Sequence, residues 1–409
     1  MRQAQALRKP LRGPWVWQLL LALPFLATFV ATRFDYPIHG DETTFYPITL
    51  QFAAQPVPSV ELLQSYEQIQ TPLMFWLFGL LGRAVGPELW KLRAGIALLS
   101  YLTLLLFFRL CRARCPGVKP WVPVYATAAL ALSPYYLGTS FYYYTDIPCL
   151  FAMLAALASY LSGHRLGGAI AAGAAMLTRQ FSAFLPAAYA LASLMTRRPS
   201  GIDRGHAITL ILPFAMLVPL MLLWGGISPQ NRLRGLISQG GYIHPEFVNY
   251  LVLATGAYSL PMTLLLVGEI FQRQRILLTA LLTPLFWLAI PRPNPESLNL
   301  PVKTLGYLDI VLTRLFGDHK TIPYFLLWVL GCLILYEIFE IERREPQKLI
   351  LFSIAGFFVM HLFAHMVWDK YLLLVLPFVF LSLARGYARS ATFACARLRP
   401  EAPGQGVPR

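Results

Sequence analysis

Long apolar runs, separated by short polar segments, recur along the whole chain. Within each run the apolar residues are continuous rather than alternating, which favours helices over the strands of a β-barrel. Helices satisfy their own backbone hydrogen bonds in lipid, so runs of this kind are typical of membrane spans. The pattern predicts an all-α polytopic membrane protein with about 12 transmembrane helices, at residues 15–32, 89–110, 121–141, 146–161, two spans that flank 179–180, 208–224, 247–267, 277–290, 322–339, 349–367 and 371–383.

The segment 33–88, which joins the first two spans, has a different pattern. From residue 45 to 55 apolar side chains recur at helical spacing, and Pro56 and Pro58 end that pattern. Ser59 is a typical N-cap for a second short helix. The apolar run 72–86 is shorter than the roughly twenty residues that a span needs, and it contains Arg83. We therefore expect a first extracytoplasmic loop that contains interfacial helices.

The composition excludes a soluble protein. Hydrophobic residues make up 57% of the 409 residues and charged residues only 13%, with a mean hydropathy of +0.56. A soluble protein of this length does not bury that much apolar surface. The net charge of +15 comes largely from Lys and Arg clusters between the apolar runs. That distribution is the positive-inside pattern rather than a nucleic-acid-binding patch, and it predicts that both termini are cytoplasmic.

The basic residues before the first span, together with the absence of a small-residue cleavage site, indicate a retained signal anchor. We expect one membrane domain over 1–399 and a disordered cytoplasmic tail over 400–409. The five cysteines form no clear disulfide framework, and Cys111 and Cys115 lack the second pair or histidine of a zinc site. They are expected to be free structural thiols.

Under this topology, the polar residues that could do chemistry meet on the non-cytoplasmic side of the membrane. Acidic residues gather early in the chain and basic residues gather late. That polarity suits an enzyme that deprotonates one substrate and holds an anion on the other. In chain order the main candidates are Asp35, His39, Asp41, Glu42, Tyr144, Asp146, Arg179, Gln180, His319, Lys320, His361, His365, Asp369 and Lys370.

Asp41 is the candidate general base, because a carboxylate at the start of an interfacial helix can point into a cavity and accept a proton. The alternative is that Asp41 caps the helix that starts at Glu42 and offsets its dipole. For Glu42 the alternatives are to orient the acceptor, to bind a metal or to complement the dipole. Asp35 has an ordinary loop acid as its alternative. Tyr144 belongs to a tyrosine run that is typical of an aromatic belt and equally of a sugar cavity.

The basic candidates also have two interpretations each. Arg179 lies between two apolar runs, so it either faces a polar cavity or snorkels to lipid phosphates. His319 and Lys320 follow a glycine and either hold a phosphate or belong to an ordinary loop. His361 and His365 share a helix face. The acidic partner of a known metal motif does not accompany them, which favours a channel lining or donation to phosphate.

Several of these residues resemble a known superfamily. The Asp41-Glu42 pair, the stretch 70–73 (Gln-Thr-Pro-Leu) and the Leu-Arg pair at 92–93 resemble the GT-C superfamily of membrane glycosyltransferases, which use polyprenyl-phosphate-linked sugars. Protein mannosyltransferases and the lipid A aminoarabinose transferases share that opening. A closer likeness lies at 132–181, where LSPYYLGTSFYYYTD and then MLTRQF resemble the dolichyl-phosphate-glucose α-1,2-glucosyltransferase family.

The resemblance implies a GT-C fold and an inverting transfer of a hexose, of glucose or mannose type, from a polyprenyl-phosphate sugar to an acceptor hydroxyl. It implies that Asp41 takes the acceptor proton and that basic residues of the later loops hold the departing lipid phosphate. No cofactor and no metal site are expected. The implied acceptor and sugar contacts are Glu42, Asp35, His39, Tyr144, Asp146 and Gln180, and the implied donor-phosphate contacts are Arg179, His319, Lys320, His365 and Lys370.

The expected partners are a lipid-linked sugar donor, a glycan, lipid or protein acceptor, and membrane lipids, with no nucleic acid. The composition, rich in Ala, Arg and Leu, suggests a bacterial inner membrane, with the active site facing the periplasm or exterior. A transporter or flippase of a lipid-linked or amphipathic substrate is the alternative. Such proteins often show repeated halves with broken helices, and the sequence shows no such halves.

Overall fold

The computed structural model describes residues 15–116, 118–195, 204–229, 243–292, 306–364 and 367–397, and within these ranges every regular element is a helix. The elements labelled η are short 3-10 helices. The elements up to residue 195 are α2 (Trp15–Thr32), α3 (Glu42–Ala54), α4 (Val60–Gln64), α5 (Leu73–Val85), α6 (Leu89–Arg114), α7 (Trp121–Ala131), α8 (Pro134–Thr139), α9 (Asp146–Leu161), α10 (Arg165–Met176), η1 (Gln180–Ala183) and α11 (Phe184–Met195). Those that follow are α12 (Arg204–Trp224), α14 (Pro245–Tyr258), α15 (Leu260–Thr263), η2 (Leu264–Leu266), α16 (Val267–Ile270), α17 (Arg273–Leu288), α18 (Tyr307–Phe316), η3 (Gly317–Lys320), α19 (Thr321–Glu342), α20 (Leu349–His361), η4 (Asp369–Leu374) and α21 (Leu376–Arg397).

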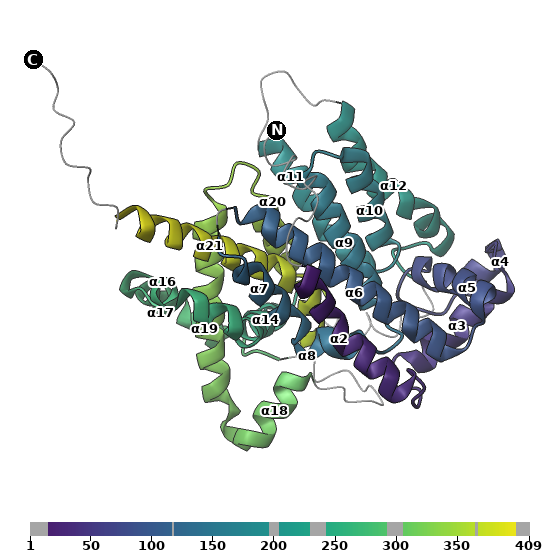
Figure 1. Ribbon diagram of the computed structural model, residues 1–409, viewed down its shortest axis with the longest axis horizontal. Helices are drawn as coiled ribbons and strands as arrows, with labels where there is room; N and C mark the ends of the chain where they lie inside the picture. The colour runs from purple at the N-terminus through teal and green to yellow at the C-terminus, as the bar shows by residue number, and fades with distance from the viewer. Residues whose placement is uncertain are drawn as a thin grey trace, which may run out of the picture.

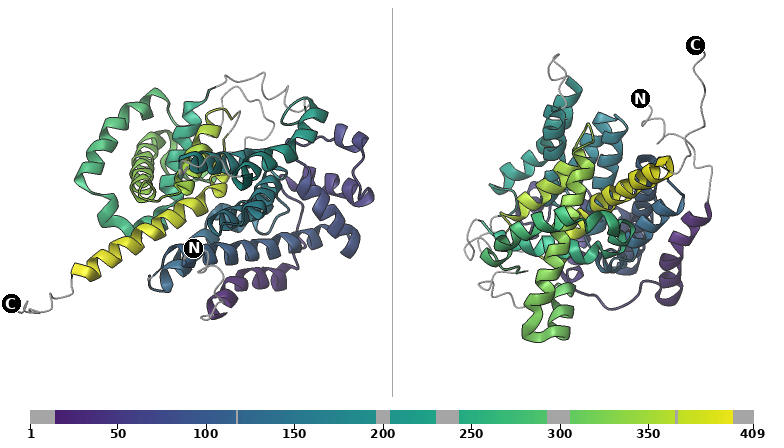
Figure 2. Two further views of the ribbon diagram at one scale, coloured as in Figure 1. Left: turned by 90° about the horizontal axis from the view of Figure 1, so that it is seen from above. Right: turned by 90° about the vertical axis from the view of Figure 1, so that its left-hand side faces the viewer.

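The long helix α6 runs through the assembly, with α2 packed along it (Figure 1). On one side of α6, helices α9, α10, α12 and α11 pack in that order, and α20 packs on α11. On the other side, α14 packs on α19, while α21 contacts α6, α7 and α19. The two additional views in Figure 2 show the same grouping from above and from the side. The short helix η4 contacts both α9 and α14, so it lies where the two groups meet.

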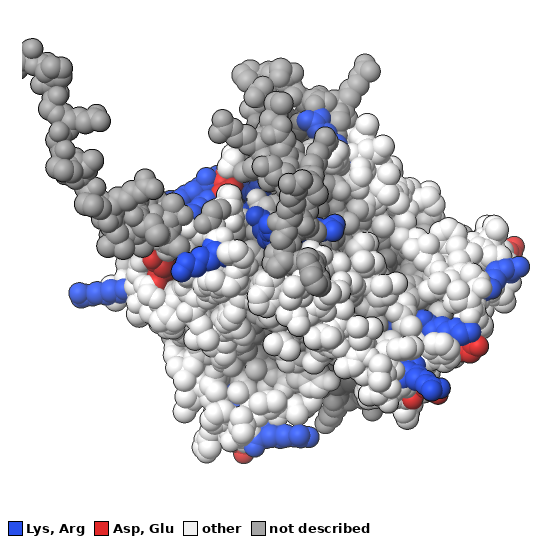
Figure 3. All heavy atoms as spheres, viewed as in Figure 1, with Lys and Arg blue, Asp and Glu red and all other residues white. Residues whose placement is uncertain are grey.

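Two helical stretches in the described part of the chain have the length and apolar composition of a membrane span, Leu89–Arg114 and Tyr307–Glu342. The pair Pro245–Tyr258 and Leu260–Ile270, bent by 60°, forms a third candidate. The face drawn in Figure 3 is largely uncharged across its middle, while the charged side chains lie in its upper part and along its edges. These apolar helices are typical of an integral membrane protein. The expected count of about 12 spans stays a prediction.

The helices expected within the first loop are confirmed. The apolar pattern of 45–55 is α3, which packs against α5, and the run 72–86 is α5. Ser59 caps α4, since its side chain accepts a hydrogen bond from the backbone N–H of Leu62 at 3.2 Å. All three helices lie together at one end of the molecule (Figure 1). The expected interfacial position of these helices stays a prediction.

Candidate active site

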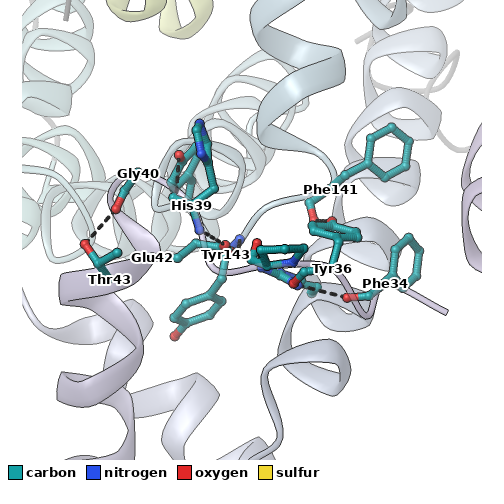
Figure 4. Close-up of polar contacts among 11 residues, drawn as sticks. Phe34, Tyr36, His39, Gly40, Glu42, Thr43, Phe141 and Tyr143 are labelled. Atoms are coloured by element: carbon teal, nitrogen blue, oxygen red, sulfur yellow. Dashed lines mark hydrogen bonds and ion pairs between the residues drawn. The ribbon is translucent and has the colours of Figure 1, made fainter. Parts of the chain in front are cut away.

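The backbone between α2 and α3 is wrapped around the guanidinium of Arg93, which reaches it from α6. Figure 4 shows Phe34, Tyr36 and Glu42 around this place. Arg93 donates to the carbonyl oxygens of Phe34, Tyr36 and Pro37 at 3.0, 2.6 and 3.2 Å. Phe34 has a left-handed backbone with φ of 55°, which costs a non-glycine residue on the order of 1–3 kcal/mol. Arg93 therefore holds in place a strained loop, and this loop leads to Asp41 at the start of α3.

Glu42 completes the same arrangement from the first turn of α3. Its carboxylate receives two hydrogen bonds from Arg93, at 2.8 and 2.6 Å, and both side chains are almost fully buried. The Glu42 carboxylate also accepts hydrogen bonds from the backbone N–H groups of His39 and Tyr143, at 3.1 and 2.6 Å. A buried carboxylate needs this number of donors. Glu42 therefore has a positioning role, because it connects α3 and α6 with the turn before α9 that contains Tyr142, Tyr143 and Tyr144, which we call the tyrosine turn.

Asp41 occupies the N-cap position of α3, but its side chain makes no capping hydrogen bond. One carboxylate oxygen instead lies 3.0 Å from the Nζ of Lys370, at the start of η4. The Asp41 side chain is 36% exposed and that of Lys370 is 14% exposed. This geometry favours a carboxylate directed at solvent or substrate over the helix-cap alternative.

A second ion pair lies beside the first. Arg179, which immediately precedes η1, donates to the carboxylate of Asp146 in the first turn of α9, and both side chains are buried. The guanidinium of Arg179 also lies 5.5 Å from the ring centre of Tyr371. This position, inside the fold and against a carboxylate, does not match the lipid-snorkelling alternative for Arg179.

We call Asp41, Asp146, Arg179 and Lys370 the charged cluster. Burial of Lys370 works against its charge, but the carboxylates of Asp41 and Asp146 outweigh this effect and raise the pKa of Lys370 above its usual value. Its ammonium also lies 4.4 Å from the ring centre of Trp368. Two carboxylates and two cations, supplied by four separate segments, therefore meet in this cluster, and the Asp41 carboxylate is its most exposed member.

The tyrosine turn approaches the cluster from the side. Tyr144 has its ring centre 6.0 Å from the Nζ of Lys370. Its hydroxyl donates to the carbonyl of His39 at 3.4 Å and closely approaches the α-carbon of Gly40, where a Cβ would collide with it. Burial raises the pKa of Tyr144, and the negative charge of Asp41 adds to the effect. The hydroxyl is therefore a neutral hydrogen-bonding group at physiological pH.

Of the other predicted site residues, two lie on the surface and one lies in a buried structural contact. Asp35 is exposed, and exposed His39 packs its ring on Tyr142, with centroids 5.5 Å apart. Gln180 is buried and donates to the backbone of Ile69 and to Ser228, at 2.6 and 2.5 Å. This places Gln180 in a structural contact next to Arg179.

The loop 317–320 is the η3 helix, at the end of α18 that lies away from α3 (Figure 1). His319 is exposed, and Lys320 pairs at 3.0 Å with Asp309 of α18. None of the described contacts of these two residues joins them to the charged cluster. His365 lies outside the described residues.

An apolar cavity of about 460 Å³ lies between α7, α14, α15 and α18. Its lining includes Tyr125, Ala129, Pro261, Tyr307 and Val311. The volume falls in the range of roughly 300–1,000 Å³ that is usual for small-molecule sites. No group of three His, Cys, Asp or Glu side chains with the spacing of a metal site is present in the described part of the chain.

No protein-family model and no curated protein matches this chain. Among solved structures, it is similar to ArnT from Cupriavidus metallidurans bound to undecaprenyl phosphate, with 14% identity, a TM-score of 0.45, and 96% and 82% of the two chains covered. The apo state of ArnT gives 14% identity, a TM-score of 0.42 and coverages of 93% and 79%. The S. cerevisiae protein O-mannosyltransferase Pmt1-Pmt2 complex bound to the sugar donor gives 18% identity and a TM-score of 0.38, over 60% of this chain and 38% of that one. At these scores the likeness assigns the chain to no family.

Proposed function

We propose that the protein is an integral membrane glycosyltransferase of the GT-C type. It moves a hexose from a polyprenyl-phosphate sugar to an acceptor hydroxyl, with Asp41 as general base. The observation that carries the proposal is the Asp41 carboxylate: it is partly exposed, makes no cap hydrogen bond, and lies against the ammonium of Lys370 beside the Asp146–Arg179 pair. The sequence resemblance around Asp41-Glu42 and 132–181 supports the same class.

In the reaction, the acceptor oxygen attacks the anomeric carbon as its proton passes to Asp41. The bond between that carbon and the phosphate oxygen breaks, and its electron pair leaves with the lipid phosphate, so the anomeric configuration inverts. Because the protonated Asp41 is neutral, Lys370 loses its anionic partner in the same step. Its positive charge then stabilises the phosphate that is released, as electrostatic catalysis requires.

Arg179 and the tyrosines complete this assignment. Arg179 lies beside Tyr371 in the charged cluster and supplies the second cation near the phosphate. Asp146 orients that guanidinium, while the neutral hydroxyl of Tyr144 is placed to bond a sugar or acceptor hydroxyl. The donor-phosphate contacts expected from the resemblance at His319, Lys320 and His365 stay predictions.

The 460 Å³ cavity, which offers apolar walls and few polar groups, is the proposed site for the isoprene units of the donor's chain nearest the phosphate. The cavity is walled in part by α14 and α18, and α14 also contacts η4, the helix that carries Lys370. A lipid phosphate could therefore place its chain in the cavity and its phosphate at the cluster. The protein is proposed to act in the membrane, with this site on the non-cytoplasmic face, on a glycan, lipid or protein acceptor.

The direct test is release of free polyprenyl phosphate from a donor with a radiolabelled lipid chain, using the purified protein and a crude acceptor extract. A set of polyprenyl-phosphate hexoses, including glucose and mannose, covers the proposed donors. Acceptor-dependent release supports the transferase. Donor that crosses a vesicle membrane intact, with no release, would overturn the transferase in favour of a transporter.

A further inference from the structure

Asp369 is a buried carboxylate immediately before Lys370, and the charged cluster does not contain it. Its side chain has no exposed surface, and among the described residues no lysine or arginine is paired with it. Burying such a charge is costly unless hydrogen bonds compensate for the lost water. The surroundings of Asp369 therefore indicate what the residue is for.

Three donors from three helices converge on this carboxylate. The hydroxyl of Tyr135 in α8 donates to Oδ1 at 2.5 Å. The hydroxyl of Tyr258 in α14 and the backbone N–H of Leu308 in α18 donate to Oδ2, at 2.6 and 3.0 Å. Each carboxylate oxygen thus has at least one partner, and the start of η4 is fixed to three separate elements.

The first turn of α18 strengthens this attachment. The backbone N–H of Tyr307 donates to the Tyr135 hydroxyl at 2.9 Å, so a second amide of the same turn reaches Asp369 through one tyrosine. The positive end of a helix dipole favours a carboxylate at this place. A Cβ at Gly306 would collide with the Asp369 carboxylate, so the glycine permits the close approach.

We infer that Asp369 is a positioning residue, which fixes η4 so that the ammonium of Lys370 meets the carboxylate of Asp41. The inference rests on the proposed function only in that the Asp41–Lys370 pair serves the transfer. A lysine side chain is long and flexible, so its ammonium is placed accurately only when its backbone is held. Asp369 and Lys370 are the first two residues of η4, so holding Asp369 also holds the backbone from which the Lys370 side chain starts.

The cavity adds a second consequence. Tyr258 and Leu308, two of the three donors to Asp369, also line the 460 Å³ cavity. The Asp369 carboxylate therefore links the wall of the cavity to the segment that carries Lys370. A variant that disturbs Asp369 is expected to disturb Lys370 while the rest of the helix assembly stays in place.

The test measures how fast Lys370 is acetylated by acetic anhydride in the full-length protein in detergent, with the modified peptide quantified by mass spectrometry. It needs no glycosyl donor, so its outcome is independent of whether the transferase assignment holds. Asp369→Asn is compared with Asp309→Asn, the matched control. Asp309 of α18 is also buried and also accepts a tyrosine hydroxyl, that of Tyr324, but its partners Tyr324 and Lys320 belong to α19 and η3, and neither lies in η4.

Asp369→Asn is expected to raise the acetylation rate of Lys370 by about tenfold or more over wild type, since each pKa unit lost by the amine gives tenfold more free base. Asp309→Asn is expected to leave the rate near that of wild type. Should Asp369→Asn fail to fold, Tyr258→Phe removes one donor and is expected to change the rate in the same direction. Equal acetylation in wild type and in the folded variants would overturn the inference, and so would an equal rise in both aspartate variants.

A double variant separates positioning from general loosening. In an Asp41→Asn background the pair with Lys370 is already lost, so Asp369→Asn is expected to add little to the acetylation rate. A further rise of the same size in that background would mean that Asp369 acts on Lys370 by local unfolding instead. If wild type proves active, Asp369→Asn is also expected to lower kcat more than it raises KM.

Discussion

Replacing Arg93 by Met tests whether the loop that carries Asp41 is held from α6. Arg93 makes five hydrogen bonds, two to Glu42 and three to the carbonyl oxygens of Phe34, Tyr36 and Pro37. Methionine matches much of its apolar stem but leaves the buried Glu42 carboxylate without a cation. Breaking a buried pair from one side costs about 3–5 kcal/mol of folding free energy.

The matched control is Arg343→Met. Arg343 also pairs with a glutamate, Glu340, but its side chain is 50% exposed. An exposed pair contributes at most about 1 kcal/mol. Both variants are compared with wild type by reversible denaturant unfolding in mixed micelles, followed by tryptophan fluorescence. Arg93→Met is expected to lose at least about three times as much free energy as the control.

Adding Glu42→Gln to Arg93→Met removes the uncompensated charge, so the double variant is expected to be more stable than the sum of the single losses by about 2 kcal/mol. Additive losses would refute the view that these two buried charges act as a pair. If Arg93→Met loses no more folding free energy than Arg343→Met, the claim that Arg93 holds the loop before α3 would be refuted.

Four further predictions concern the Asp41–Lys370 pair, Gly40 and the cavity. Because Asp41 raises the pKa of Lys370 while burial lowers it, Asp41→Asn is expected to shift the pH midpoint of Lys370 acetylation downward; an unchanged or higher midpoint would contradict the pairing. The Asp41–Lys370 pair stabilises the fold at pH values below the ordinary lysine pKa, and this stabilisation is expected to disappear as the pH rises through the raised pKa of Lys370. Denaturant titrations of wild type and Asp41→Asn near pH 9 and pH 11 measure the difference in unfolding free energy, which is expected to be smaller at the higher pH. Gly40→Ala, at a φ of 56° and against Tyr144, is expected to destabilise the fold by about 1 kcal/mol or more, in the same unfolding assay. Ala129→Trp fills the cavity wall and is expected to weaken binding of a fluorescent polyprenyl phosphate by tenfold or more without changing Lys370 acetylation, whereas unchanged lipid affinity would exclude the cavity as the chain site.

The helical character of the chain and the elements of its first loop could be predicted from local pattern alone. The spacing of apolar residues and the positions of the prolines predicted α3 and α5, and Ser59 predicted the start of α4. Such signals depend on a few neighbouring residues, which a sequence contains in full. The count of membrane spans depends on how helices tilt, bend and pack, which hydropathy does not specify.

The members of the charged cluster could be named from sequence, because charges in or beside apolar runs need a reason to be there. Their pairing could not be predicted. Asp41 and Lys370 are 329 positions apart, and nothing local indicates that α3 and η4 meet. For the same reason the pairing of Lys320 with Asp309 could not be predicted, and the phosphate role expected for His319 and Lys320 stays a prediction.

Two residues with strong positioning roles had no role assigned from sequence. Arg93 stood out only as part of a resemblance, yet it organises the loop before Asp41. Asp369 was one acid in a short polar turn, and its tyrosine partners come from distant helices. In both cases the signal was a charge placed within or next to an apolar helix, which indicates a buried partner without identifying it.

The central claim is that Asp41 takes the proton of the acceptor hydroxyl, and the most direct measurement compares wild type with Asp41→Asn in sugar transfer. Both proteins receive the same polyprenyl-phosphate sugar and acceptor extract, with Glu61→Gln, an exposed acid in α4, as the matched control. Donor binding is measured separately on each protein. Asp41→Asn is expected still to bind donor but to transfer sugar at least about a hundredfold more slowly than wild type, the lower end of what a general base contributes. Transfer by Asp41→Asn at the wild-type rate would contradict the central claim.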